Sequence, residues 1–242
     1  MNSFLDLLFP KVCSICKKKG NYLCDTCKKL FKRNLPECYI CRSISPNFKT
    51  HPSCKGNHSL EHIFVSWEYN SLSSDLLKKY KYSYVYDISS VLSEFFLGSI
   101  LNSNFNNVLK NSLITNIPIS SNRLRERGFN QTYNLAKSLS NSFNLDFSAN
   151  LLGRKNTEGH QALKDKDERN DISQKDFFIQ EALDISSYQS ITIIDDVITT
   201  ASTLESVSRV LKNHYGKELV INAACMFRGR PYFSSSSEGT SS

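Results

Sequence analysis

The stretch ITIIDDVITTAST, residues 191–203, decides the fold. It opens with a short run of apolar and β-branched residues that is typical of a buried strand. Two carboxylates follow, Asp195 and Asp196, and then a loop rich in hydroxyl groups and the start of a helix. Ligands of open α/β sheets bind beyond the carboxyl ends of the strands. The stretch therefore predicts a strand that places an acidic pair at the ligand-binding edge of a parallel sheet.

The loop after the acidic pair has the features of a phosphate-binding site. Its consecutive backbone N–H groups can point at one anion, and the following helix presents its positive N-terminus to the same group. The acidic pair would accept hydrogen bonds from ribose hydroxyls. A strand, a turn and a capped helix without a ligand is the simpler alternative, because Thr, Ser and Asp are common capping residues. The predicted phosphate contacts are Thr199, Thr200, Ala201, Ser202 and Thr203.

The chain after residue 58 alternates between strand and helix patterns. Such alternation is typical of a mostly parallel sheet with helices on both faces. We therefore predict an α/β domain over residues 59–230, followed by a Ser-rich tail over residues 231–242 that is expected to be disordered. The expected strands are 63–67, 113–117, 191–194 and 219–226, and the expected helices are 72–82, 87–101, 130–143 and 202–215.

Seven of the eight cysteines lie before residue 58, in three CxxC pairs and one HxxC pair. A CxxC turn directs two thiolates toward one point, and two such turns supply the tetrahedral ligand set that Zn²⁺ prefers. Residues 1–58 are therefore predicted to form a small zinc-ribbon domain with structural metal sites. The simplest partition is one site of Cys13, Cys16, Cys24 and Cys27 and a second of Cys38, Cys41, His51 and Cys54.

Other readings of the cysteines stay open. His58 is a rival fourth ligand for the second site, and the pairs can also interleave. Disulfides are disfavoured by the odd count in a chain that shows no export signal. Cys225 lies in an apolar run and is expected to be a buried small hydrophobe.

A second motif, IPISSNRLRERGFNQ, spans residues 117–131 and is basic. We expect a strand to end at Pro118, an exposed loop to carry Arg123, Arg125 and Arg127, and a helix to open near Asn130. Guanidinium groups bind phosphate oxygens in a bidentate manner, so the three arginines are predicted to contact an anionic ligand. A solvated charged face is the alternative. Further polar candidates beside this motif are Arg154, Lys155, Gln161, Arg169 and Asn170.

The acidic pair and the TTAST sequence after it resemble the signature that binds phosphoribosyl pyrophosphate (PRPP) in type I phosphoribosyltransferases. Ala201 departs from that signature, which usually has glycine there, and its methyl group restricts the loop. The two motifs together with GRKNTEGHQALKDKDERND (153–171), LKKYKY (77–82) and the paired CxxC head resemble the ComF family. That resemblance implies a phosphoribosyltransferase-like domain behind a double zinc ribbon.

The same resemblance implies a role in natural transformation, in which the protein handles single-stranded DNA on the cytoplasmic side of the uptake machinery at the inner membrane. PRPP with Mg²⁺ is the implied ligand, and Asp195 and Asp196 are the implied catalytic residues if phosphoribosyl transfer occurs. Whether transfer occurs, and to which acceptor, is left open. A nucleotide-salvage phosphoribosyltransferase is the alternative, and an adaptor that uses its zinc ribbons to hold partners is a third class.

Two segments combine basic and aromatic side chains, as non-specific single-strand binding requires. The formal net charge of +7 also suits an anionic partner. An amphipathic helix with a solvated basic side is the alternative for the first segment. The candidates are Lys78, Lys79, Tyr80, Lys81 and Tyr82 in one segment, and Arg123, Arg125, Arg127 and Phe129 in the other.

Overall fold

The computed structural model describes residues 10–82, 86–156 and 176–229. The candidates Gln161, Arg169 and Asn170 and the 231–242 tail lie outside these residues. Among the described helices, none is long and apolar enough to cross a membrane.

A five-stranded sheet, parallel throughout, forms the centre of the molecule, with the order β1-β7-β6-β2-β3. The predicted parallel α/β architecture is therefore confirmed. A separate antiparallel pair, β4 and β5, was not predicted. The strands are β1 (His62–Glu68), β2 (Ser112–Asn116), β3 (Phe147–Ser148), β4 (Leu152–Arg154), β5 (Phe177–Ile179), β6 (Ser190–Ile198) and β7 (Val220–Arg228).

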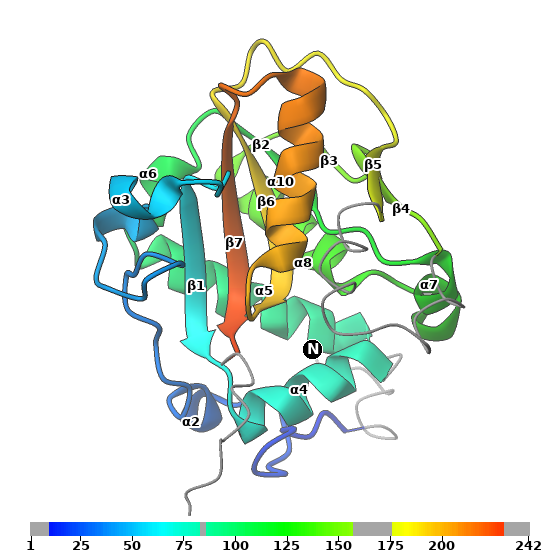
Figure 1. Ribbon diagram of the computed structural model, residues 1–242. Coiled ribbons are helices and arrows are strands. Elements are labelled where there is room, and N and C mark those ends of the chain that lie inside the picture. Colours follow the sequence, from blue (N-terminus) through cyan, green and yellow to red (C-terminus); the bar gives the residue numbers. More distant parts are fainter. Residues whose placement is uncertain (1–9, 83–85, 157–175, 230–242) are drawn as a thin grey trace, which may run out of the picture.

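Helices cover both faces of the sheet (Figure 1). On one face, α10 packs on Ile191 and Ile193 of β6; on the other, α4, α5, α6 and α8 pack around Ile194. Burial on both sides explains why β6 begins as an unbroken run of apolar and β-branched residues. The helices are α2 (Asp25–Lys28), the 3-10 helix η1 (Pro46–Phe48), α3 (Pro52–Lys55), α4 (Ser71–Tyr82), α5 (Tyr86–Leu101), α6 (Phe105–Val108), α7 (Ser121–Arg127), α8 (Gln131–Phe143) and α10 (Ser202–Tyr215).

The cysteine-rich head lies along the outer edge of β1. The Asn34 N–H donates to the Ser66 carbonyl at 3.0 Å, and the Thr50 N–H donates to the Glu61 carbonyl at 2.7 Å. These contacts cover a strand edge that would otherwise expose unpaired backbone groups. Head residues also join the hydrophobic cores on the two faces of the sheet. Phe31 packs with Trp67 and Phe95 on one face, and Tyr39 is buried on the other.

The arginine motif differs from its prediction. The segment expected to be an exposed loop is the helix α7, which is capped by the Ser120 hydroxyl and ends at Gly128. Gly128 has a φ of 76°, a left-handed conformation that glycine adopts at little cost. A cap residue at one end and a glycine at the other are therefore enough to turn the polar sequence SNRLRER into a short helix.

Candidate functional site

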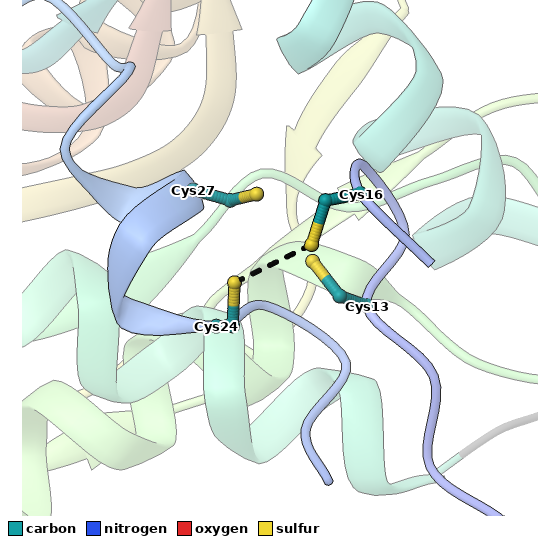
Figure 2. Close-up of side chains that lie close together, drawn as sticks. All are labelled: Cys13, Cys16, Cys24 and Cys27. Atoms are coloured by element: carbon teal, nitrogen blue, oxygen red, sulfur yellow. Dashed lines mark hydrogen bonds between the residues drawn. The ribbon is translucent and has the colours of Figure 1, made fainter. Parts of the chain in front are cut away.

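The first cluster, Cys13, Cys16, Cys24 and Cys27, brings four sulfur atoms within 4.8 Å of one another. Figure 2 shows the four side chains converging, with 3.6 Å between the sulfurs of Cys16 and Cys24. The backbone explains the geometry of the first pair: the Cys13 N–H donates to the Lys18 carbonyl, and the Lys17 N–H donates to the Cys13 carbonyl. Cys13 and Cys27 are buried in the core beneath α4.

The second cluster, Cys38, Cys41, His51 and Cys54, also gathers its ligand atoms within 4.8 Å. Its turn repeats the first one, because the Cys38 N–H donates to the Ser43 carbonyl and the Arg42 N–H donates to the Cys38 carbonyl. His51 Nδ1 lies 3.3 Å from the Cys41 sulfur. His58, the rival ligand, is instead directed toward Glu205, with 3.3 Å between Nδ1 and a carboxyl oxygen.

The thiols of each cluster affect one another electrostatically. Burial raises the pKa of Cys13, but backbone hydrogen bonds from Cys24, Cys16 and Ile15 outweigh it and lower that pKa to about 6. Burial and the neighbouring sulfurs raise the pKa of Cys27 to about 12. One thiolate therefore forms readily and opposes ionisation of the next, a conflict that a bound divalent cation would remove.

Both clusters have the donor set of a structural zinc site. Four protein ligands of sulfur, or of sulfur and imidazole nitrogen, fill the tetrahedral coordination of Zn²⁺ and leave no position for a substrate. All eight cysteines are free thiols. The two groups can thus each hold one zinc ion, and metal binding would stabilise a segment with few helical or strand residues of its own.

The acidic pair lies in the second half of β6, where the burial of the strand decreases. Asp195 and Asp196 are both half-buried, and Asp195 Oδ1 accepts a hydrogen bond of 2.8 Å from the Asp196 N–H. Lys81, near the end of α4, lies with its ammonium 2.5 Å from Asp196 Oδ2. A lysine predicted to contact DNA is therefore an ion-pair partner of the candidate ligand site.

Burial and the adjacent Asp196 carboxylate raise the pKa of Asp195 to about 8. The raised pKa favours the protonated form of Asp195, and Lys81 pairs with the Asp196 carboxylate, so both effects reduce the negative charge at the strand end. A smaller negative charge there favours the approach of an anionic ligand. A cation or ribose hydroxyls near the pair would favour the ionised form of Asp195.

The 199–203 loop comprises the turn 199–201, which connects β6 to α10, together with Ser202 and Thr203, the first two residues of α10. Ala201 has φ 65° and ψ 6°, a left-handed conformation at the N-cap position of α10. Alanine is strained in this conformation, whereas glycine adopts it at little cost. Thr199, Thr200 and Ser202 are exposed. A small open hollow lies beside the loop, and its lining includes Asp195, Thr199, Ala201, Ser202 and Thr203.

Gly229 is a residue of the site that the sequence analysis missed. Its N–H donates to the Ile198 carbonyl at 2.8 Å, and a Cβ added there would lie 2.8 Å from Thr199 Cγ2. Glycine therefore lets the end of β7 lie directly against the 199–203 loop. Nothing in the glycine's local sequence reveals this contact, because β7 and the loop meet only through the parallel pairing of β6 and β7.

The predicted arginines follow β2, the neighbour of β6 in the sheet. The carboxyl ends of two parallel neighbours meet at one edge, so α7 and the acidic pair belong to the same edge of the sheet. Arg123 and Arg125 are exposed, whereas Arg127 is half-buried and donates to Gln131 Oε1 at 3.3 Å. Of the further candidates, Arg154 faces Asp176 at 3.6 Å.

The side chains of the first basic and aromatic segment, residues 78–82, are less accessible to single-stranded DNA than predicted. Tyr80 is fully buried and donates to the Gln131 carbonyl at 2.9 Å, so it cannot stack on a base. Lys79 donates to the Ser14 carbonyl at 3.3 Å, and Lys81 is paired as described. Lys78 remains exposed, and Phe129 is half-buried against Tyr80. The side chain of Tyr82 lies outside the described residues.

These observations define a class: an α/β protein with a parallel five-stranded sheet, an acidic pair at the carboxyl end of a central strand, and two cysteine clusters fit for structural zinc. The chain is 27% identical over 196 residues to Competence protein F of Haemophilus influenzae, covering 79% of this chain and 85% of that protein. It is 25% identical over 201 residues to Competence protein ComFC of Streptococcus pneumoniae, covering 81% and 84%. No family model matches the chain. The similarity to the two competence proteins confirms the resemblance to the ComF family.

Proposed function

We propose that this protein acts in competence for DNA uptake and that it binds PRPP at the carboxyl end of β6. The names of both relatives support the competence role. One observation carries the ligand proposal: the acidic pair precedes a hydroxyl-rich loop in which Ala201 adopts the left-handed conformation directly before α10. This order of groups suits a ribose and a phosphate bound side by side.

In the proposed complex each group has a distinct task. Asp195 and Asp196 would accept hydrogen bonds from the ribose hydroxyls, and the 199–203 loop would bind the 5-phosphate. Arg123 and Arg125 would contact the pyrophosphate oxygens. Carboxylate oxygens are also the hard ligands that Mg²⁺ prefers, so the acidic pair and the ligand's phosphates together would hold that ion, which would neutralise pyrophosphate charge.

Calorimetric titration with PRPP, with and without Mg²⁺, tests the ligand proposal. We expect Asp195→Ala together with Asp196→Ala to weaken binding at least about 100-fold, since two charged hydrogen-bond acceptors are lost. Far-UV circular dichroism of the double variant checks that it remains folded. An affinity equal to that of the wild type would show that the acidic pair does not contact the ligand.

We further propose that single-stranded DNA binds on the cytoplasmic side of the membrane through exposed cations near the same edge, Arg123, Arg125 and Lys78. Backbone binding of this kind weakens as salt rises, because each neutralised phosphate releases counterion. Arg123→Glu with Arg125→Glu should therefore lower the affinity for every sequence and reduce the salt slope by about 1 to 2. Lys81 is unsuitable for this test because it is paired with Asp196.

Gel-shift titrations at two salt concentrations, repeated in the presence of PRPP, measure these effects. Competition between the two ligands would place both at one edge of the sheet. An affinity that is flat against salt and unchanged in the arginine variant would leave these cations without a role in DNA binding. Lys110→Glu is a matched control on a basic residue just before β2, at the opposite end of that strand from α7.

A further inference from the structure

Glu205 is a buried carboxyl group in the first turn of α10, with 5% of its surface exposed. Its N–H donates to the Ala201 carbonyl at 2.9 Å and so closes the first helical turn onto the 199–203 loop. A displacement of Glu205 would therefore also displace the loop that precedes it. Buried acidic groups of this kind are stable only when their oxygens are well supplied with donors.

Within the described residues, every donor that reaches the Glu205 carboxyl group comes from the head or from Ser59, which directly follows it. The Tyr39 hydroxyl donates to one oxygen. The Ser59 hydroxyl and N–H approach the other oxygen at 2.7 and 3.1 Å, and His58 Nδ1 lies 3.3 Å from the first.

Tyr39 and Ser59 are close in sequence to ligands of the second cluster. Tyr39 lies inside the CxxC turn, directly after Cys38, and Ser59 is five residues beyond Cys54. The Tyr39 carbonyl also accepts a hydrogen bond of 3.1 Å from the buried Arg228, the last residue of β7. The cluster turn is thus hydrogen-bonded both to α10 and to the end of β7, where Gly229 touches the 199–203 loop.

We propose that Glu205 is a positioning residue for the 199–203 loop and that the metal of the second cluster holds it in place through Tyr39 and Ser59. Loss of that metal frees the two head segments, removes donors from the Glu205 carboxyl group and loosens the first turn of α10. The affinity of the loop for a phosphate-bearing ligand then depends on metal bound at a site that does not touch the ligand. The ligand part of this inference rests on the proposed function.

Hydrogen exchange on the full-length protein tests the structural part without any ligand. Cys54→Ser should remove one zinc of two by elemental analysis and increase exchange in the first turn of α10. Cys16→Ser is the matched control, because it removes the other zinc from a cluster whose buried cysteines pack beneath α4. Equal protection of α10 in the wild type and in Cys54→Ser would overturn the proposal.

Titration with PRPP and Mg²⁺ then tests the coupling. We expect Cys54→Ser to weaken binding about tenfold, a typical coupling between two sites. Tyr39→Phe and Glu205→Gln should each weaken binding less, and in the Glu205→Gln background the further effect of Cys54→Ser should largely vanish. Full additivity of the two changes would overturn the coupling through Glu205.

The two readouts separate this inference from the proposed function. If α10 loosens on loss of the second zinc while the wild-type protein does not bind PRPP, the proposed ligand is wrong and the connection between metal and helix stands. If PRPP binds but neither exchange nor affinity responds to the second zinc, the ligand site stands and this inference is wrong.

Discussion

The two cysteine clusters have the same turn geometry but are connected to the sheet in different ways. The first cluster packs by apolar contact, with Cys13 and Cys27 buried in the core beneath α4. The second has one buried cysteine, Cys38, in place of two, and is connected by hydrogen bonds, through Tyr39 to Glu205 and Arg228. Similar metal sites can therefore be joined to a protein core in different ways, one through its buried ligand side chains and the other through the hydrogen bonds of a residue between its ligands.

The difference extends to the acidic pair. Helix α4 packs against the first cluster and contains Lys81, which pairs with Asp196. Helix α10 is hydrogen-bonded to Tyr39 of the second cluster's turn and follows the loop after the acidic pair. The two clusters thus approach the same sheet edge from opposite faces. Variants that disturb one side but not the other can measure how independent the two sides are.

The largest expected effect is on stability and comes from the first cluster. Cys13→Ser removes a ligand whose side chain has no exposed surface, so we expect a loss on the order of 5 kcal/mol, enough to unfold the segment that carries the first cluster. Cys41→Ser, at an exposed ligand, should cost less. Elemental analysis should find two zinc ions per wild-type chain, and thermal unfolding should rank the variants.

Less than about half a zinc ion per chain would contradict both metal sites, because structural sites of this type are essentially filled. Equal losses of stability in the two variants would contradict the difference between the clusters.

The next effect is a pH dependence that arises from Asp195. Its pKa of about 8 in the folded protein lies above the ordinary 3.8, so the folded state binds this proton more tightly than the unfolded state does. The resulting contribution to the free energy of unfolding is complete below pH 4 and is lost as the pH rises toward 8. Asp195→Asn should remove this part of the slope.

Chemical denaturation between pH 5 and about pH 9 measures the slope. Asp184→Asn is the control: Asp184 is exposed and the hydrogen bonds of Ser186 lower its pKa from 3.8, so it stays ionised over this range and its replacement should leave the slope unchanged. A slope that is the same in Asp195→Asn and the wild type would show that Asp195 is ionised throughout this range.

A smaller effect is expected from Gly229, on the α10 side of the comparison. Gly229→Ala places a methyl group 2.8 Å from Thr199 Cγ2, so the exposed threonine must move and the loop with it. We expect affinity for PRPP to fall several-fold with a stability change of about 1 kcal/mol or less. Gly98→Ala in α5 is the matched control, because a Cβ there meets nothing within 4 Å.

The control variant should be stabilised by about 0.5–1 kcal/mol through helix propensity and should leave the affinity unchanged. Calorimetry gives the affinities, and denaturant unfolding gives the stabilities. If Gly229→Ala binds PRPP as the wild type does, the contact between β7 and the loop is unimportant for the ligand.

The smallest effect is expected from Ala201→Gly. Glycine relieves the left-handed strain of about 1–2 kcal/mol. It also removes a buried methyl group, worth about 0.8 kcal/mol, and raises the entropy of the unfolded chain by about 0.4–1 kcal/mol. These terms nearly cancel, so the free energy of unfolding should change by less than about 1 kcal/mol. Denaturant unfolding that shows a larger gain would mean that the loop is more strained than the backbone angles indicate.

The sequence by itself determined the parallel α/β architecture, the acidic pair at the end of β6 and the gathering of two cysteine clusters. These features depend on local order: an apolar run before two carboxylates, or two ligands separated by two residues, fixes the geometry within a few residues. The α7 helix was missed because its polar sequence has no apolar periodicity and is defined by the residues that cap it.

Only the tertiary structure decided the partners of these groups. It paired Lys81 with Asp196, buried Tyr80, turned His58 away from the second cluster toward Glu205, and placed Gly229 against Thr199. Each contact joins residues that are far apart in the chain, and their distance is set by which strands are neighbours and which helices cover them. Local patterns carry no information on such contacts, because the same lysine, tyrosine or glycine would fit a solvated surface equally well.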